Sequence, residues 1–167
     1  FGLTLLVYGA SLGNAFVRWD DGLLVYDNAA IRQITPASLK RIFTTYDPEL
    51  YIPLTFFSYQ IEHLLFGLNP TVYHLTNLLL HIANVLLVTL VVTQLGIRLR
   101  TAWIIGLLFA IHPMHVESFA WVTQRKDVLY VFFYMLALIY YWDYLQQKNV
   151  KKYSLSLPGF TSLVASS

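Results

Sequence analysis

The feature that most constrains the fold of this 167-residue chain is the length of its uncharged stretches. Residues 1–17, 63–97, 101–116, 128–142 and 153–167 contain no Asp, Glu, Lys or Arg. A helix that crosses a bilayer needs about 20 mostly apolar residues. The spacing of the charges therefore predicts an all-α fold, a polytopic transmembrane helical bundle, in place of a water-soluble domain.

Composition narrows the class of function further. Charged residues make up 12% of the chain and apolar residues 57%, whereas about a quarter of a typical soluble domain is charged. The formal net charge is only +2, so the chain lacks the basic surface that binds nucleic acid. It has no cysteine, which excludes a disulfide framework and a thiol nucleophile. Membrane lipid is an expected partner and nucleic acid is not.

The uncharged stretches and their flanks predict 4 to 5 spans, at about 1–17, 71–95, 101–117, 128–145 and, truncated, 153–167. Residues 18–70 then form a long helical first outer loop. A secretory signal could mimic the first span, but no basic segment or cleavage site accompanies it. Because the chain starts without Met inside apolar sequence, we expect 1–167 to be a partial transmembrane domain cut at both ends.

Basic residues in short loops indicate the orientation, because they favour the cytoplasmic side. Two turns on one side of the predicted bundle carry five of them: Arg98, Arg100, Lys148, Lys151 and Lys152. The opposite turn carries two, Arg125 and Lys126. The loop 18–70 and the turn 117–127 are therefore expected on the outer face.

Two helices are predicted within the outer loop. Thr35-Pro36 resembles a helix cap with proline at the first helical position. The apolar residues that follow, Leu39, Ile42, Phe43 and Tyr46, are spaced for a helix lying on the membrane surface. A second helix is expected from Pro53 to about Phe66, ended by Gly67-Leu68-Asn69-Pro70.

The carboxylates of Asp20 and Asp21 directly follow the first predicted span. Of two adjacent carboxylates, one can act as a general base while the other binds a cation or a hydroxyl. The alternative is a solvated pair of charges that flanks the membrane.

A polar stripe runs along the second predicted span, at steps of three and four residues: His74, Asn77, His81 and Asn84. This spacing places all four on one helix face. Polar residues within a span usually face the bundle interior or a cavity. The stripe indicates either a substrate cavity or hydrogen bonds between helices.

The segment His112-Pro113-Met114-His115-Val116-Glu117 is followed by Arg125 and Lys126. Two histidines and a carboxylate could bind zinc or iron. The two basic residues fit anion binding better, because a guanidinium suits phosphate oxygens. A capped helix–loop–helix is the purely structural alternative.

Several motifs occur in an order that resembles GT-C glycosyltransferases: Phe16-Val17-Arg18-Trp19-Asp20-Asp21, Tyr51-Ile52-Pro53-Leu54-Thr55, Phe66-Gly67-Leu68-Asn69-Pro70, His74-Leu75-Thr76-Asn77, Leu108-Phe109-Ala110-Ile111-His112-Pro113 and Arg125-Lys126-Asp127. Over about residues 10–147 the chain is similar to the N-terminal membrane region of bacterial tetratricopeptide-repeat proteins. These are related to the transmembrane and tetratricopeptide-repeat O-mannosyltransferases of animals.

The resemblance implies an enzyme that moves a sugar, such as mannose or another hexose, from a polyprenyl- or dolichyl-phosphate donor to an acceptor hydroxyl on the outer face. Asp20 or Asp21 would be the catalytic base, and Arg125 and Lys126 would bind the donor phosphate. His112, His115, Glu117, His74, Asn77 and His81 would line the site, with no metal ligand assigned. Ile52 departs from the family, whose animal members usually have Arg there, so one basic candidate is missing.

The resemblance also implies the partners: membrane lipid, a lipid-phosphate sugar as donor, and an acceptor protein or glycan. No cofactor is certain, and a divalent cation stays open. The location would be a bacterial inner membrane, or the endoplasmic reticulum in a eukaryote. Two alternatives remain: a non-catalytic membrane anchor for a repeat domain that binds proteins, and a lipid-linked sugar transporter that uses the polar stripe.

Overall fold

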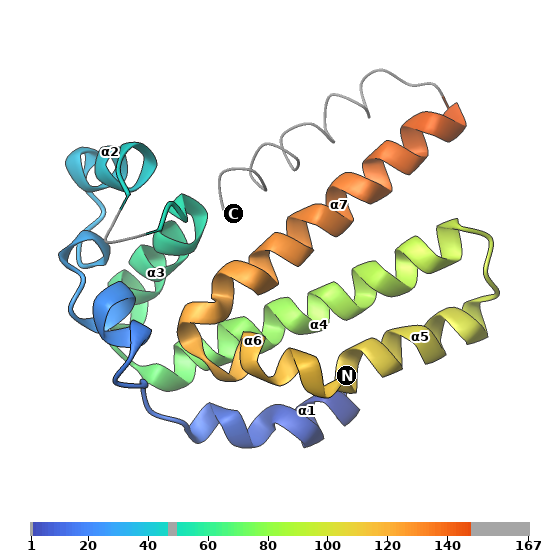
Figure 1. Cartoon of the computed structure of the whole chain (residues 1–167), viewed down its shortest axis with the longest axis horizontal. Helices are drawn as coiled ribbons and strands as arrows, with labels where there is room; N and C mark the ends of the chain where they lie inside the picture. Colours follow the sequence, from blue (N-terminus) through green and yellow to red (C-terminus); the bar gives the residue numbers. More distant parts are fainter. Residues whose placement is uncertain (1, 47–49, 148–167) are drawn as a thin grey trace.

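The structure, a computed structural model, describes residues 2–46 and 50–147 (Figure 1). The α-helices are α1 (Gly2–Tyr8), α2 (Pro36–Thr44), α3 (Pro53–Phe66), α4 (Pro70–Gln94), α5 (Leu99–Ile111), α6 (Val116–Ala120) and α7 (Arg125–Gln147). Short 3-10 helices lie at Gly9–Gly13 (η1), Ala29–Ile31 (η3), Pro113–His115 (η4) and Val122–Gln124 (η5), and a π-helical turn at Gly22–Tyr26 (η2). The predicted all-α fold is confirmed for the described residues.

Two helices have the length and apolar composition needed to cross a membrane. They are Pro70–Gln94 and Val122–Gln146, each of 25 residues. At a rise of 1.5 Å per residue such a helix is about 37 Å long, more than the hydrocarbon core of a bilayer. They correspond to the spans predicted at 71–95 and 128–145. The first of them, α4, lies at the centre of the fold and packs against α5, α6 and α7.

The other two spans predicted within the described residues are shorter helices. Residues 101–117 were expected to form one span, but α5 ends at Ile111, because Pro113 cannot continue the helix. In the first segment the apolar helical stretch covers Thr4–Gly13. The described part of the chain thus has two helices of spanning length and two shorter apolar ones. The span predicted at 153–167 lies outside the described residues.

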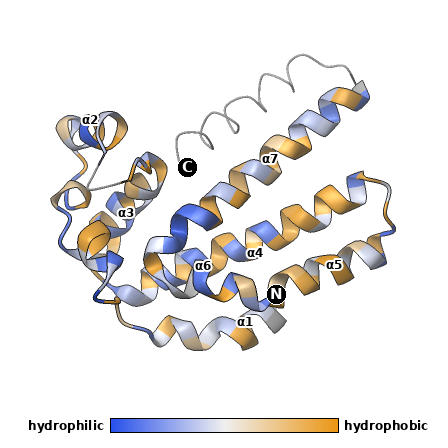
Figure 2. Cartoon of the chain, in the orientation of Figure 1, coloured by the Kyte–Doolittle hydropathy of each residue, from blue (hydrophilic) through white to orange (hydrophobic). Residues whose placement is uncertain are grey.

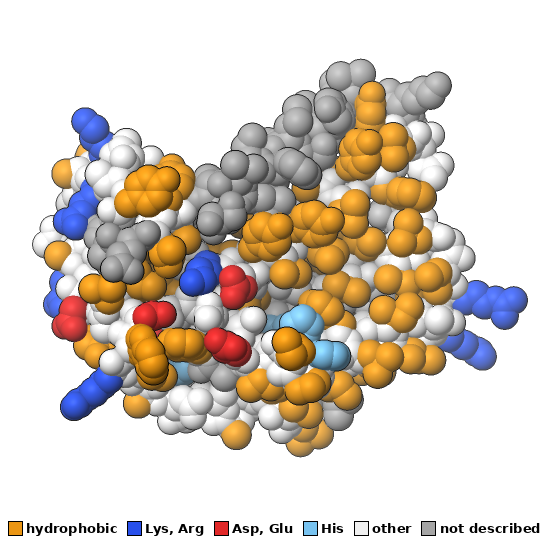
Figure 3. Space-filling model, viewed as in Figure 1, with side chains coloured by type: hydrophobic (Ala, Val, Ile, Leu, Met, Phe, Trp, Pro, Cys, Tyr) orange, Lys and Arg blue, Asp and Glu red, His pale blue; other side chains and the backbone are white. Residues whose placement is uncertain are grey.

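Polar and apolar residues are separated along the long axis of the molecule. Helix α5 ends partway along α4, whereas the starts of α4 and α7 lie with α6 at one end, beside α2 and α3 (Figure 1). Hydrophilic residues gather there (Figure 2), and so do acidic side chains, whereas apolar side chains cover the visible face of the long helices (Figure 3). Basic side chains stand both at this end and at the opposite end, where α5 begins (Figure 3). The scarce charges thus lie at the two ends of the helices.

Local sequence signals set the limits of the outer-loop helices. Thr35 Oγ1 accepts the Ser38 N–H and Ser38 Oγ accepts the Thr35 N–H, a capping box that starts α2. Gly67, with φ +64°, ends α3, since a side chain would be strained in that conformation. Both predicted outer-loop helices are therefore confirmed.

The apolar side of α2 differs from the prediction. Ile42 is 1% exposed and belongs to a core of loop residues such as Val25 and Phe56 that also includes Tyr73 of α4 and Val122 of η5. Leu39 packs against the same core, and only Phe43 and Tyr46 remain exposed. The prediction that this whole face rests on the membrane surface is corrected, because part of the face packs against a hydrophobic core that the loop shares with α4 and η5.

Candidate functional site

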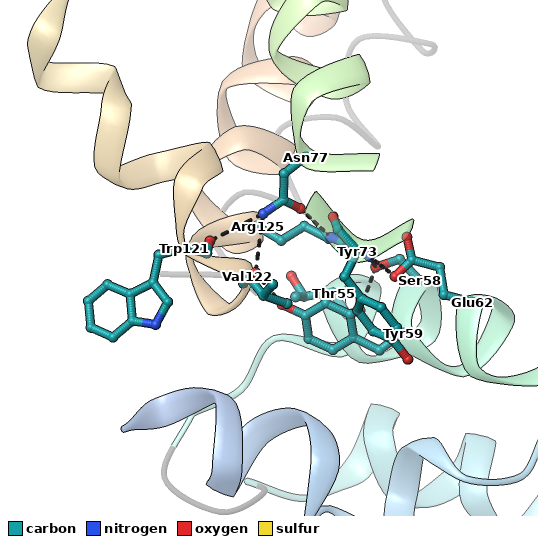
Figure 4. Close-up of polar contacts among 9 residues, drawn as sticks. All are labelled: Thr55, Ser58, Tyr59, Glu62, Tyr73, Asn77, Trp121, Val122 and Arg125. Carbon is teal, nitrogen blue, oxygen red and sulfur yellow. Dashed lines mark hydrogen bonds and ion pairs between the residues drawn. The ribbon is translucent and has the colours of Figure 1, made fainter. Parts of the chain in front are cut away.

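The guanidinium of Arg125 is the centre of a buried polar cluster at the end where α3, α4 and α7 meet (Figure 4). Its Nη1 lies 2.6 Å from Glu62 Oε2 and also donates to Ser58 Oγ at 3.1 Å. Its Nε donates to Asn77 Oδ1 at 2.6 Å, and its Nη2 donates to the Tyr73 carbonyl at 2.8 Å. All the guanidinium nitrogens are therefore engaged, and Arg125 is 0% exposed.

Aromatic rings enclose the same guanidinium. The Arg125 Cζ atom lies 4.6 Å from the centroid of the Tyr59 ring and 5.6 Å from that of Tyr73. Cation–π attraction of this kind is strongest where water is excluded. Burial raises the pKa of Tyr59, an effect that nearby Arg125 opposes and nearby Glu62 and Asp21 reinforce. Tyr59 therefore stays a neutral phenol, able to donate a hydrogen bond.

The short turn η5 (Val122–Gln124), directly before Arg125, is held by the same elements. The Val122 carbonyl accepts hydrogen bonds from Tyr59 Oη at 2.9 Å and from Asn77 Nδ2 at 3.3 Å. Asn77 Nδ2 also donates to the Trp121 carbonyl at 3.2 Å, while the Trp121 indole points away from the cluster (Figure 4). Side chains of α3 and α4 thus fix both the backbone of this turn and the arginine that follows it.

Asp21 connects the segment before α2 to this turn. Its Oδ1 accepts the Thr123 N–H at 3.1 Å, and its Oδ2 accepts the Val17 N–H at 2.8 Å. Its side chain is 0% exposed. Both carboxylate oxygens of Asp21 are therefore occupied by backbone donors.

Asp20 differs from its neighbour in exposure. It is half-buried and lies directly before Asp21, at the start of the helical turn that leads into η2. The sequence presents the two carboxylates as equivalent, but the fold separates them: Asp21 holds the backbone in place, whereas Asp20 retains access to solvent.

The polar stripe of α4 faces the other helices. Besides Asn77, His81 Nε2 lies 3.1 Å from the Ala110 carbonyl of α5, and Asn84 Nδ2 donates to the Val128 carbonyl of α7 at 2.9 Å. His74 is buried, 1% exposed. Of the two readings of the stripe, hydrogen bonding between helices is what Asn77, His81 and Asn84 do in this structure.

The remaining predicted site residues follow the end of α5 and lie closer to solvent. His112 is exposed, and its Nδ1 accepts the Met114 N–H, so it caps the turn that Pro113 begins. His115 is half-buried, with its ring centroid 5.8 Å from those of His112 and His81. Glu117 is exposed, and its Oε1 accepts from Gln124 Nε2.

Lys126 is half-buried in the first turn of α7, next to the fully buried Arg125. The two basic residues that were expected to share the donor phosphate thus have different surroundings. Within residues 2–46 and 50–147, no group of three or more His, Asp and Glu side chains is arranged to hold a metal ion.

Glu62, Ser58 and Tyr59 are members of the cluster that sequence reasoning missed. None of these three residues was among the predicted site residues. The sequence spacing could have revealed them, because Thr55, Ser58, Tyr59 and Glu62 lie on one face of α3. A carboxylate on an otherwise apolar helix is rarely buried without a charged partner.

The fold and this site define a helical protein with two helices suited to cross a membrane and a buried polar cluster at one end of them. Comparison with known proteins shows homology to the protein O-mannosyl-transferases. The chain is 31% identical to protein O-mannosyl-transferase TMTC1 of Mus musculus over 156 residues, which are 87% of this chain and 16% of the relative. It is 33% identical to TMTC3 of Homo sapiens over 150 residues, 84% of this chain and 16% of the relative.

A shorter region is more similar still, with 40% identity to TMTC2 of Mus musculus over 99 residues, 54% of this chain and 11% of the relative. The chain thus spans about a sixth of the length of the first relatives it matches. No family model matches the chain. No solved structure matches it either.

Proposed function

We propose that the chain is part of a GT-C-type membrane glycosyltransferase that moves a sugar from a polyprenyl- or dolichyl-phosphate donor to an acceptor hydroxyl. The homology to protein O-mannosyl-transferases over 87% of the chain is the observation that carries this proposal. It favours mannose as the sugar and a protein as the acceptor. The protein would be a multi-pass protein of the endoplasmic reticulum or, in a bacterium, of the inner membrane, with the cluster end of the helices on the outer face.

Asp20 is the proposed catalytic base, and the difference in surroundings between the two carboxylates supports this choice. A general base must reach the proton that it removes. Asp20 is half-buried, whereas Asp21 is fully buried and accepts two backbone N–H groups. In the proposed step, Asp20 takes the proton of the acceptor hydroxyl, whose oxygen bonds to the sugar C1. The bond from C1 to the phosphate oxygen breaks, and the lipid phosphate departs with the electron pair.

Lys126 is the proposed contact for the donor phosphate. An exposed or half-exposed cation can stabilise the negative charge that develops on a departing phosphate. Arg125 is engaged by Glu62, Ser58, Asn77 and the Tyr73 carbonyl, so in this proposal it shapes the site without contacting the phosphate. The exposed His112 and Glu117 would line the approach of the acceptor.

The test is sugar transfer by the full-length protein, with Asp20→Asn and Asp27→Asn compared. Asp27 is an exposed carboxylate of the same loop, which makes it a matched control. Loss of a general base lowers kcat by about 10²- to 10⁴-fold. Undiminished transfer by Asp20→Asn would overturn the assignment of the base, whereas no transfer by the wild-type protein would favour the non-catalytic anchor for a repeat domain. Transfer measured with EDTA and after added Mg²⁺ tells whether a divalent cation takes part.

A further inference from the structure

The ion pair between Glu62 and Arg125 joins α3, near the end of the outer loop, to the turn that holds Asp21. Glu62 lies on α3, and Arg125 begins α7. Glu62 is 6% exposed and Arg125 0% exposed, so each charge is removed from water and is matched mainly by the other. A buried ion pair is costly to form, and loss of one partner leaves an uncompensated charge inside the protein.

A short series of contacts connects the ion pair to Asp21. One residue, Gln124, separates Arg125 from Thr123, whose backbone N–H donates to Asp21 Oδ1. Directly before Thr123, the Val122 carbonyl accepts hydrogen bonds from Tyr59 Oη and Asn77 Nδ2. Tyr59 lies on the same face of α3 as Glu62, and its ring covers the guanidinium. Movement of Arg125 would therefore displace the turn that presents the Thr123 N–H to Asp21.

We infer that Glu62 and Arg125 are positioning residues that set the place of the Asp20–Asp21 segment through the 121–125 turn. This inference rests on the proposed function, in which Asp20 is the base. Glu62 contacts neither the segment nor any proposed substrate group; it holds Arg125, Arg125 holds the turn, and the turn holds Asp21. A catalytic group displaced by about 1 Å can lose about 10²-fold in rate, so a remote ion pair can control turnover.

The alternative is that the pair contributes only to overall stability. In that case its loss would weaken the whole fold evenly, with no selective effect on the Asp20–Asp21 segment. The two roles predict different rates of hydrogen exchange at the Val17 and Thr123 amides, which are the donors to Asp21. A positioning role predicts faster hydrogen exchange at these two amides, while amides in the middle of α4 keep their protection.

The experiment compares Glu62→Gln and Arg125→Lys in the full-length protein with Asp27→Asn and Arg41→Lys. The controls carry the same chemical changes at exposed positions of the same loop. We expect Glu62→Gln to lower kcat by about tenfold or more with KM changed less than about twofold. We expect exchange at Val17 and Thr123 to rise about tenfold, because local opening becomes easier. Both controls should behave like the wild-type protein.

Ser58→Ala is a milder variant, used if the charge changes prevent folding. It removes one acceptor of Arg125 Nη1 and leaves Glu62 in place. A smaller change of the same kind, in both kcat and exchange, supports the inference. Unchanged exchange at Val17 and Thr123 in folded Glu62→Gln or Ser58→Ala would overturn it. If Asp20→Asn keeps full activity, Asp20 is not the base, and if the wild-type protein transfers no sugar, the proposed function fails; in both cases the exchange data still decide whether the pair positions this segment.

Discussion

The Thr123 backbone N–H donates to Asp21 Oδ1 over 3.1 Å, a contact that joins residues 102 positions apart in the chain. The other oxygen, Oδ2, accepts the Val17 N–H only four residues away. The Asp21 carboxylate thus stabilises its own local turn and also connects that turn to the segment before α7 through a hydrogen bond. This double role explains why the fold buries Asp21 completely and leaves Asp20 half-buried beside it.

The first prediction concerns Asp21 itself. Asp21→Ala leaves the Val17 and Thr123 N–H groups without their acceptor, and an unsatisfied buried donor costs about 1–3 kcal/mol. We expect the free energy of unfolding to fall by at least that amount, as measured by denaturant titration in detergent micelles. Asp20→Ala is the matched control, expected to change it by less than about 0.5 kcal/mol. An equal loss in both variants would contradict the separate roles of the two carboxylates.

The second prediction is a coupling between Glu62 and Arg125. Arg125→Met and Glu62→Met each leave one buried charge unpaired, which costs about 3–5 kcal/mol of unfolding free energy. The double variant removes both charges, so we expect it to lose much less than the sum of the single losses. The same titration gives the coupling energy as a double-mutant cycle. Simple additivity would mean that the two charges do not depend on each other.

Features of the fold that depend on neighbouring residues could be predicted from the sequence, whereas contacts between residues far apart in the chain could not. The limits of α2 and α3 follow from local signals, namely the Thr35 cap, Pro53 at the start of a helix and Gly67 at its end. The spans at 71–95 and 128–145 follow from uninterrupted apolar sequence. The end of α5 at Ile111 was missed, because an uncharged stretch was extended past the proline that stops the helix.

The cluster around Arg125 could not be derived in this way. Arg125 and Glu62 are 63 positions apart, and no local pattern pairs them. Arg125 was singled out from the sequence as a basic residue that follows two histidines, but Glu62 was not singled out. Only the packing of α3 against α4 and α7 brings them together and leaves Lys126 nearer to solvent.

The third prediction tests the close packing of α4 and α5. A Cβ atom at Gly106 would lie 2.2 Å from Thr89 Oγ1, which itself donates to the Val85 carbonyl. Gly106→Ala should therefore lower the free energy of unfolding by about 1–3 kcal/mol, the usual cost of overpacking. Thr89→Ala in the same protein should recover part of this loss by removing the hydroxyl. Gly13→Ala, which meets open space, is the control. Equal effects at Gly13 and Gly106 would mean that the helices are not in close contact here.

The fourth prediction concerns Tyr59 and pH. Burial raises the pKa of its phenol above the ordinary value near 10. Above pH 10 the unfolded chain therefore releases this proton while the folded protein keeps it. The contribution of Tyr59 to stability is complete below pH 10 and is lost as the pH rises toward the folded-state pKa, with a slope of up to about 1.4 kcal/mol per pH unit.

Tyr59→Phe removes both the titration and the hydrogen bond to the Val122 carbonyl, but keeps the ring beside Arg125. At pH 7 it should cost about 1 kcal/mol of unfolding free energy. Between pH 10 and 11 its stability should fall less steeply than that of the wild-type protein, because one buried phenol no longer titrates. Tyr46→Phe, at a side chain that is 75% exposed, should follow the wild-type slope. Parallel slopes for Tyr59→Phe and wild type would mean that the phenol also ionises freely in the folded protein, and that the turn before Arg125 is open to water.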